Sequence, residues 1–102
     1  MPDDFKDPDQ TPIITNEQGG QQSKLSGRFD LLPPKAITVV AEVLDYGARR
    51  YAPNNWRLIP VEDHVNHALA HLFDYGMYQS KAKRKEALSH AACRVLFALD
   101  LL

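Results

Sequence analysis

The chain has few of the residues that build disulfide-bonded or zinc-clustered proteins. Its 102 residues include a single cysteine, Cys93, which excludes an intramolecular disulfide and any zinc site made from several cysteines. Cys93 stands in a stretch rich in alanine and leucine, where we expect a small buried residue. Neither an HExxH pattern nor a GxSxG turn occurs, so two common hydrolase motifs are absent.

Long apolar runs and an excess of positive charge are also missing. No run reaches the length of a transmembrane helix, and the start, Met1-Pro-Asp-Asp, lacks the apolar segment of a signal peptide. We therefore expect a cytoplasmic protein with no membrane partner. The formal net charge is −1, whereas general nucleic-acid-binding proteins carry a large positive excess. A nucleic acid polymer is not expected as a partner, but a local basic site for one nucleotide remains open.

Alternating apolar and polar runs are absent, so the fold class that we predict is all-α. Apolar residues recur at helical spacing over about 35–51, 61–79 and 82–102, which predicts a small bundle of about three main helices. Pro60 precedes the second helix, and Glu62 and Asp63 occupy its first turn, where negative charge complements the helix dipole. The third helix opens with four basic residues that oppose the dipole: Lys81, Lys83, Arg84 and Lys85.

The apolar stripes of these helices predict the core. They are Ile37, Val40, Ala41, Leu44, Ala48 and Tyr51, then Val65, Leu69, Leu72, Phe73 and Gly76, then Leu88, Ala91, Ala92, Val95, Leu99 and Leu102. The back of the third helix (Cys93, Phe97 and Leu101) is apolar as well, and a helix that is apolar all round needs cover on every side. A domain this small also buries a modest core. We therefore expect homo-oligomerisation, as a homodimer or a homotetramer, to complete the bundle.

The start of the chain differs in composition from the rest. Residues 1–26 are rich in proline, glycine, glutamine and aspartate and poor in apolar residues, so burial cannot offset the entropy of ordering them. We predict a flexible, irregular N-terminal arm over 1–26 and a folded all-α domain over 27–102. In the domain's first segment, Pro33 and Pro34 end an extended stretch and Pro34 can begin a helix.

Residues 46–57, Tyr-Gly-Ala-Arg-Arg-Tyr-Ala-Pro-Asn-Asn-Trp-Arg, form the most distinctive segment. They predict the end of a helix that runs into a Pro-Asn-Asn turn and gathers arginines and aromatic rings. Guanidinium groups bind phosphates, and aromatic faces stack on bases, so the segment suits a nucleotide. A packed loop anchored by Trp56, with its arginines in water, is the alternative.

Polar residues on the second helix form a further candidate site. His64, His67, His71, Asp74 and Tyr78 follow one another at spacings of three and four, on the side opposite the Val65 stripe. Three interpretations remain open: a solvated polar face, the wall of a pocket between helices, and a zinc or iron site.

Carboxylates on the first helix suggest a different metal. Glu42 and Asp45 are three residues apart, so both could reach one Mg²⁺, a hard ion that takes oxygen ligands together with substrate phosphates. Glu86 could converge on the same place, with Asp74 as a fourth acid. A solvated face is the alternative for such a pair.

The order of several segments resembles a known family. GRFDLLPP, AEVLDYGARRYAPNNWR, ALAHLFDY and LSHAACRVLFAL resemble the phage-encoded dATP/dGTP diphosphohydrolases, from about residue 24 to the end. These belong to the all-α, MazG-like nucleoside-triphosphate pyrophosphatases. The resemblance implies a helical homo-oligomer that uses Mg²⁺ to cut a deoxynucleoside triphosphate into a monophosphate and pyrophosphate. The residues at matching motif positions are Arg28, Asp30, Glu42, Gly47, Arg50, Tyr51, Asn55, Trp56, His71 and His90.

The chain departs from this pattern where the family carries acids after the second helix. Residues 79–85 read Gln-Ser-Lys-Ala-Lys-Arg-Lys, and Arg94 stands where an asparagine is common. Lysines in place of carboxylates weaken an Mg²⁺ site but still attract phosphates. The changes therefore favour holding a nucleotide over cutting it.

Three functions follow as hypotheses, and the third is a structural or regulatory helical oligomer with no ligand, in which Arg49, Arg50 and Arg57 are ordinary surface residues. In the first, the chain is a pyrophosphohydrolase in which Glu42, Asp45 and Glu86 are catalytic and hold Mg²⁺ with Asp74. Its substrate-binding residues would be Arg28, Asp30, Arg49, Arg50, Tyr51, Asn55, Trp56, Arg57, His67, His71, Lys83, Arg84 and His90. In the second, the chain binds a nucleotide signal of host defence without cutting it, in the host cytoplasm. The two nucleotide hypotheses require the arginine-aromatic corner and the acidic helices to share one cleft, within a chain or between partner subunits.

Overall fold

A computed structural model of the chain describes residues 12–102 and divides it into two compact units. We call residues 1–32 the N-terminal unit and residues 33–102 the helical unit. The prediction of an arm over 1–26 falls partly on residues 1–11, which lie outside the described residues. Each unit is described by itself.

The N-terminal unit contains a β-hairpin that the sequence analysis missed. Strand β1 (Ile13–Thr15) pairs antiparallel with β2 (Gln21–Ser23), with Ile14 opposite Gln22. The turn between them is organised by Asn16, whose Oδ1 accepts hydrogen bonds from the backbone N–H groups of Gln18 and Gly20 at 3.0 and 2.8 Å. Gly19 adopts a φ of 86°, which glycine tolerates without steric cost. A short 3-10 turn, η2 (Phe29–Leu31), follows.

The helical unit confirms the three predicted helices. They are α1 (Pro34–Arg50), α2 (Val61–Met77) and α3 (Lys81–Leu101). Pro34 stands at the start of α1, where its missing N–H costs nothing. The predicted Pro-Asn-Asn turn leads into a 3-10 helix, η3 (Asn55–Leu58), and Asn54 takes a left-handed φ of 65°, which asparagine adopts more readily than most residues.

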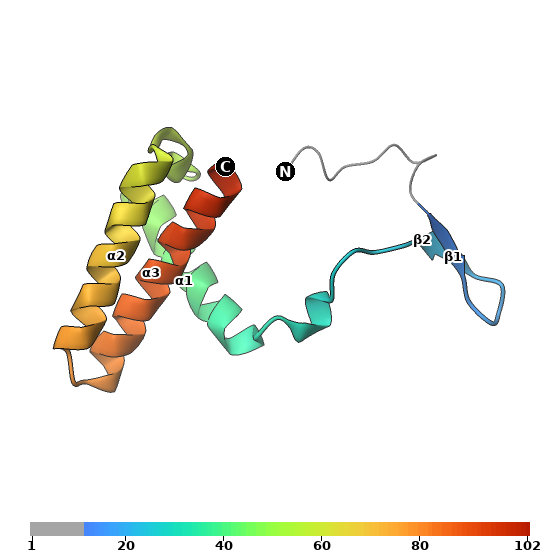
Figure 1. The fold of residues 1–102 in the computed structure, drawn as a ribbon, viewed down its shortest axis with the longest axis horizontal. Coiled ribbons are helices and arrows are strands. Elements are labelled where there is room, and N and C mark those ends of the chain that lie inside the picture. The colour runs from blue at the N-terminus through green and yellow to red at the C-terminus, as the bar shows by residue number, and fades with distance from the viewer. Residues whose placement is uncertain (1–11) are drawn as a thin grey trace. The chain divides into compact units, whose positions relative to one another are not determined.

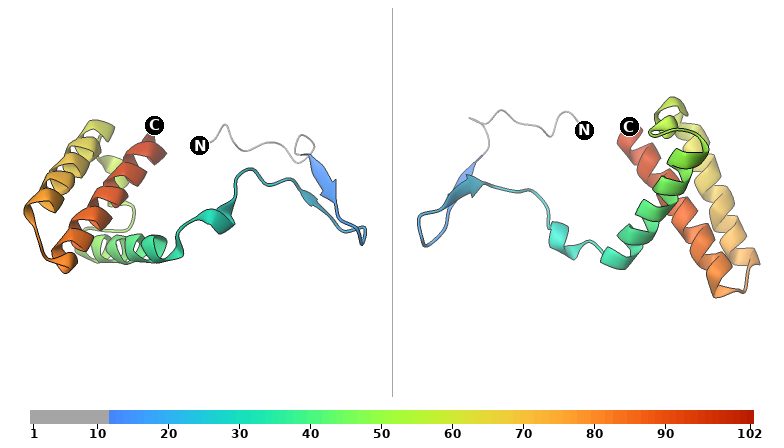
Figure 2. Two further views of the ribbon diagram at one scale, coloured as in Figure 1. Left: turned by 60° about the horizontal axis from the view of Figure 1, so that its bottom comes forward. Right: turned by 180° about the vertical axis from the view of Figure 1, so that it is seen from behind.

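The helices α2 and α3 form a hairpin, and α1 packs against α3 (Figures 1 and 2). The Cys93 thiol of α3 donates to the Val40 carbonyl of α1 across 3.8 Å. Cys93 is buried, as predicted, and burial raises its pKa, so the thiol form is favoured. In the part of the chain that the structure describes, no helix is long and apolar enough to cross a membrane.

Of the predicted stripes of α2 and α3, Ala91 is buried and Ala92 half-buried as predicted, but the larger members do not form the core of a single chain. The two helices meet through small residues, and Ala68 on α2 and Ala87, Ala91 and Ala98 on α3 are buried. The larger members of the predicted stripes, such as Leu69 and Leu99, stay exposed. Alanines form the contact between α2 and α3 because their small side chains allow two helix axes to approach closely. The bulky stripes are therefore displaced to the flank of the hairpin.

The stripe of α1 is also shifted from the prediction. Val40 and Ala48 are half-buried as expected, but Ile37, Leu44 and Tyr51 are exposed. Val39, Val43 and Gly47 are half-buried in their place. The shift has a simple cause: α1 is covered by one neighbouring helix, so only a narrow strip of its surface is buried.

Candidate functional site

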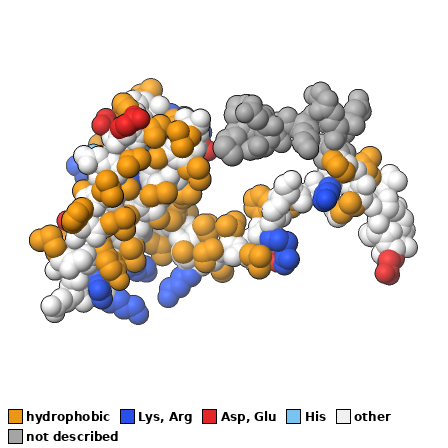
Figure 3. All heavy atoms as spheres, in the orientation of Figure 1, with side chains coloured by type: hydrophobic (Ala, Val, Ile, Leu, Met, Phe, Trp, Pro, Cys, Tyr) orange, Lys and Arg blue, Asp and Glu red, His pale blue; other side chains and the backbone are white. Residues whose placement is uncertain are grey.

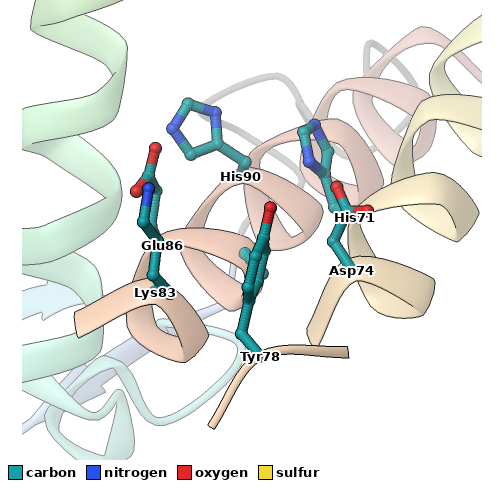
Figure 4. Close-up of a pocket in the computed structure, with 7 residues that line it drawn as sticks. His71, Asp74, Tyr78, Lys83, Glu86 and His90 are labelled. Carbon is teal, nitrogen blue, oxygen red and sulfur yellow. The ribbon is translucent and has the colours of Figure 1, made fainter. Parts of the chain in front are cut away.

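The connected end of the α2–α3 hairpin, beside the turn that joins the two helices, contains a pocket (Figure 4). Its volume is about 150 Å³, and its lining residues are His71, Asp74, Tyr78, Lys83, Glu86, Ala87 and His90. All six polar or aromatic residues of this set were singled out from the sequence. The structure therefore brings together candidates from two different helices.

Helical spacing explains how the pocket is built. His71, Asp74 and Tyr78 follow one another at intervals of three and four along α2 and its end, and Lys83, Glu86 and His90 do the same along α3. Residues at these intervals share one helix face. In Figure 4 the Tyr78 ring lies with Lys83 and Glu86 on one side and His71 and Asp74 on the other. The small side chain of Ala87 leaves room for the pocket between them.

The pocket contains a pair of histidines. The ring centroids of His71 and His90 are 5.3 Å apart. Burial lowers the pKa of His71, and the nearby His90 and Arg94 lower it further, while Asp74 opposes the shift. Burial and the neighbouring basic groups lower the pKa because each disfavours a positive charge on the His71 ring. Near neutral pH the neutral imidazole of His71 is therefore favoured, and it can donate or accept a hydrogen bond.

Basic and aromatic side chains pair where α3 begins, and one of these pairs, Lys83 and Tyr78, lines the pocket. The Lys83 ammonium lies 5.9 Å from the centre of the Tyr78 ring, and the Arg84 guanidinium lies 4.6 Å from that of Tyr75. Cations over aromatic faces are attracted by the ring's electron density. Two positive side chains are thus held at the turn where α3 begins.

The four predicted metal ligands do not gather within a single chain. Among residues 12–102, no three histidine, cysteine, aspartate or glutamate side chains are close enough to hold one ion. Asp74 and Glu86 line the pocket. On α1, Asp45 forms an exposed ion pair with Arg49 instead. The set Glu42, Asp45, Asp74 and Glu86 stays a prediction.

The arginine-aromatic corner divides into a packed half and an exposed half. In the packed half, the Trp56 ring stacks on Phe97 of α3, with centroids 4.6 Å apart and planes 6° from parallel. Arg57 lies over the same indole, 4.4 Å from its centre, and approaches Asp100 at 3.7 Å. Phe97 therefore occupies a face of Trp56 that a base would need for stacking.

The exposed half lies at the end of α1. Arg50 contacts two tyrosines, with Nη1 donating to the Tyr46 hydroxyl across 3.5 Å and the guanidinium 5.2 Å from the Tyr51 ring centre. The hydrogen bond to Tyr46 is the main cause of the raised pKa of Arg50. All three side chains are exposed, so this cluster remains available to a ligand.

Within one chain the pocket and the packed half of the corner do not share a cleft. Lys83 and Phe97 are separated by fourteen positions along α3, which corresponds to about 21 Å at the rise of an α-helix. The reason is that η3 packs against the C-terminal half of α3, while the pocket lies beside its first turns. One cleft that includes both would need a second chain.

Sequence reasoning misjudged His64, which is a structural residue. Its side chain is fully buried, and its Nε2 lies 2.9 Å from the Trp56 carbonyl oxygen while Nδ1 lies 3.2 Å from Nη1 of Arg94. A guanidinium can only donate, so Nδ1 accepts from Arg94 and Nε2 donates to Trp56. The ring also meets Phe97 edge-on at 5.3 Å. His64 thus joins η3 to the α2–α3 hairpin.

Arg28 and Asp30, in the N-terminal unit, bind each other. Nε and Nη2 of Arg28 donate to the two carboxylate oxygens of Asp30 at 2.8 and 2.7 Å. This fork of hydrogen bonds lowers the pKa of Asp30. Both side chains are exposed, and the predicted ligand contacts of this pair stay a prediction.

Comparison with protein families assigns the chain to a family. The model of the dATP/dGTP diphosphohydrolase N-terminal domain matches residues 16–102. The chain belongs to this family. The match spans β2, η2 and the whole helical unit, so both the pocket and the corner lie inside the family domain. No curated protein and no solved structure matches the chain.

Family membership does not by itself assign roles to the residues that the sequence analysis overlooked. Arg94 was noted there only as a departure from the common asparagine. In the structure it binds His64 and contributes to the lowered pKa of His71. No local pattern marks such a residue, because its contacts join positions thirty residues apart along the chain.

Proposed function

We propose that the chain binds the phosphate end of a purine deoxynucleoside triphosphate in the α2–α3 pocket. The observation that supports this proposal is the composition of the pocket. One lysine (Lys83), two histidines (His71 and His90) and two carboxylates (Asp74 and Glu86) line it from two neighbouring helices. The family description supports the choice of dATP or dGTP. The pocket is smaller than the roughly 300–1,000 Å³ of typical small-molecule sites, so it takes part of the ligand and leaves the rest outside.

The chain's own side chains suit phosphate oxygens. Lys83, with Arg84 at the same turn, supplies positive charge that offsets the charge of the phosphates. His71 stays neutral near neutral pH because its pKa is lowered, so it adds a hydrogen bond without adding to the repulsion from His90 and Arg94. Tyr78 offers a hydroxyl and a ring face at the same pocket.

The pocket's acids fit Mg²⁺ by their chemistry. Asp74 and Glu86 are carboxylates, and Mg²⁺ is commonly held by one or two carboxylates together with substrate phosphates. When bound, the ion would polarise the phosphate and help to activate water, giving a monophosphate and pyrophosphate. Glu42 and Asp45 join this set if α1 of another chain reaches the pocket.

A second candidate is retention of the nucleotide without hydrolysis. Two observations favour it. Fewer than three possible metal ligands gather at any place in residues 12–102, and Lys81, Lys83 and Lys85 surround the start of α3, where positive charge repels a cation. In this case binding would persist when Mg²⁺ is removed.

Titration calorimetry with the four deoxynucleoside triphosphates, with and without Mg²⁺, tests the proposal. We expect dATP or dGTP to bind, and Lys83→Gln to weaken binding by roughly ten- to 150-fold, because a charged hydrogen bond contributes about 1.5–3 kcal/mol. Lys35→Gln, an exposed lysine on α1, is the matched control and should leave binding unchanged. If Lys83→Gln and the control bind equally well, the pocket is not the phosphate site.

Chromatography of the recovered ligand separates the two candidates. Release of pyrophosphate that requires Mg²⁺ and is lost in Glu86→Gln supports hydrolysis. Intact ligand, bound equally in EDTA, supports retention. Trp56 is the single tryptophan of the chain, so strong quenching of its fluorescence would instead indicate that the base stacks at the corner.

A further inference from the structure

Polar side chains follow the contact between α2 and α3 from the pocket towards η3. His71 and His90 line the pocket, with ring centroids 5.3 Å apart, and His64 meets Phe97 at the same distance further along the hairpin. His67 stands between His64 and His71 on α2. Much of the remaining hairpin surface is apolar, since Figure 3 shows hydrophobic side chains gathered over α2 and α3.

The two ring contacts define the register of the hairpin. They are seven residues apart on α2 and seven residues apart on α3. Because the two helices run antiparallel, the residues three positions inward from the His64–Phe97 contact stand opposite each other. These residues are His67 on α2 and Arg94 on α3. The hydrogen bond between Arg94 and His64, at 3.2 Å, agrees with this register.

Arg94 has a charge that no described residue balances. Its side chain is half-buried. Within residues 12–102 its guanidinium makes one hydrogen bond, to Nδ1 of His64, and no ion pair. His64 accepts this bond as a neutral ring, so the positive charge of Arg94 is not compensated. A guanidinium has five N–H donors, and a half-buried charge without a partner is costly. An anion would supply what this position lacks.

Arg94 lies next to the pocket. It follows His90 by four residues on α3, so the two share one helix face and are about 6 Å apart along the helix axis. Its charge is among the causes that lower the pKa of His71. The pocket's acids, Asp74 and Glu86, lie on the other side of the histidine pair, nearer the turn between the helices. A phosphate at Arg94 is therefore separated from these carboxylates.

We propose that Arg94, with His67 opposite it, forms a second phosphate subsite for the phosphate that follows the one in the pocket. This inference deepens the proposed function and rests on it. The planar guanidinium can bind two phosphate oxygens at once, and its hydrogen bond to His64 holds it in place before the ligand arrives. The pocket of about 150 Å³ is too small for a whole nucleotide, and the subsite directs the ligand along α3 towards η3.

Proton NMR of the full chain with two inorganic probes tests the location of the subsite. The chain has four histidines, so their imidazole signals report on successive points between the pocket and η3. In buffer with Mg²⁺, inorganic phosphate should shift the signals of His71 and His90 by filling the pocket. Tripolyphosphate should shift the signal of His67 as well. The subsite would be excluded if tripolyphosphate shifted only the signals of His71 and His90.

Arg94→Gln measures what the subsite contributes to affinity, by titration calorimetry with the same probes. It should bind tripolyphosphate roughly ten- to 150-fold more weakly, because a charged hydrogen bond is lost. It should bind inorganic phosphate as well as the natural chain does, since a single phosphate occupies the pocket. Lys83→Gln should weaken both probes, and the exposed control Lys35→Gln should weaken neither. Arg94→Lys keeps the charge but not the planar fork, so it should recover part of the affinity.

A purely structural role of Arg94 predicts a different pattern. If losing the bond to His64 only loosened the fold, Arg94→Gln would weaken phosphate and tripolyphosphate alike, and the subsite would be excluded. His67→Gln removes the other member of the subsite and leaves the bond between Arg94 and His64 in place. Because His67 is exposed, this variant should keep its fold. It should weaken tripolyphosphate roughly two- to tenfold and leave phosphate unchanged.

Three further results separate the subsite from the proposed function. Tripolyphosphate binding that Lys83→Gln weakens and Arg94→Gln leaves unchanged would remove the subsite and keep the pocket. Binding that only Arg94→Gln weakens would exclude the pocket as the first phosphate position, and the subsite would fall with it as an extension of that pocket. A natural chain that binds neither probe would exclude both.

Discussion

Three histidines on α2 have different surroundings, although they follow one another at helical spacing. His64 is buried against η3 and Arg94, His67 is exposed, and His71 lines the pocket. Spacing alone places all three on one side of the helix. What separates them is the partner that each meets, because η3 covers only the first turn of α2 and the pocket opens only near its end.

Replacing His64 should destabilise the helical unit strongly. His64→Ala removes the hydrogen-bond partner of the Trp56 carbonyl and of one Arg94 N–H group, and it leaves a cavity beside Phe97. We expect a loss of about 2–4 kcal/mol in the free energy of unfolding. Urea denaturation at fixed protein concentration, followed by Trp56 fluorescence, measures it.

The matched control for this substitution is His67→Ala on the same helix. His67 is exposed, so its removal should change the stability by no more than about 0.5 kcal/mol. Equal losses in the two variants would mean that the hydrogen bonds of His64 contribute nothing to stability.

The lowered pKa of His71 predicts a dependence of stability on pH. Above the ordinary histidine value, near 6.5, both the folded and the unfolded chain hold His71 neutral, and the group adds no pH dependence. As the pH falls below that value, the unfolded chain takes up a proton that the folded chain resists, so stability falls. Replacing His71 by glutamine should flatten this part of the profile, measured by urea denaturation between pH 7.5 and 5.5. An unchanged slope would contradict the assignment.

At the scale of the elements, the first turn of α3 has the charge that is unfavourable for the helix dipole. Its first turn carries Lys81, Lys83 and Arg84 and no acid. The structure shows what compensates: the Ser80 hydroxyl caps the helix by accepting a hydrogen bond from the Lys83 backbone N–H at 3.3 Å. Lys83 of this positive turn lines the pocket, where its charge can attract a phosphate.

Removing this cap should loosen the start of α3. Ser80→Ala should lower stability by about 1 kcal/mol, whereas Ser80→Asp should preserve the cap and add a favourable charge at the helix start. Thermal denaturation by circular dichroism measures both, and Ser26→Ala, outside the helices, serves as the control. The role of the cap would be excluded if the alanine and aspartate variants behaved alike.

Much of the architecture could be predicted from local patterns. Pro34, Pro60 and the periodicity of apolar residues located the three helices, and the Pro-Asn-Asn turn was confirmed by the left-handed Asn54. These features depend on neighbours within a few residues. The same reasoning missed the β-hairpin, because its strands of three residues are too short to show an alternating pattern.

The choice of the buried face could not be predicted in this way. Both α2 and α3 carry two apolar or small-residue rows, and the prediction took the rows with the larger side chains as the core. The structure buries Ala68 on α2 and Ala87, Ala91 and Ala98 on α3, and of these four the predicted stripes included Ala91 alone. Which row faces inward depends on how closely two helices approach, a property of the pair and not of either sequence segment. The pocket could be predicted only in part for the same reason: its residues were singled out, but not which of them meet.

At the scale of the whole molecule, the unusual feature is how the apolar residues are distributed. The larger aliphatic side chains of α2 and α3 lie outside the alanine contact, on a face that stays exposed in a single chain. Such a unit gains much of its stabilisation only when the face is buried, since burial of apolar area is the main favourable term in folding. Folding and pairing should then be coupled.

Coupling predicts that thermal stability rises with protein concentration. Suppose that two copies pair through the exposed aliphatic residues of α2 and α3, which are Val65, Leu69, Leu72, Leu88, Val95 and Leu99. The midpoint of thermal unfolding should then increase by about 3–6 °C for each tenfold rise in concentration, because mass action favours the paired state. Leu69→Glu should lower the midpoint and make it independent of concentration, whereas Ile37→Glu should keep the concentration dependence of the natural chain. Differential scanning calorimetry at several concentrations measures all three. A midpoint that stays constant for the natural chain would show that the alanine core alone holds the helical unit together.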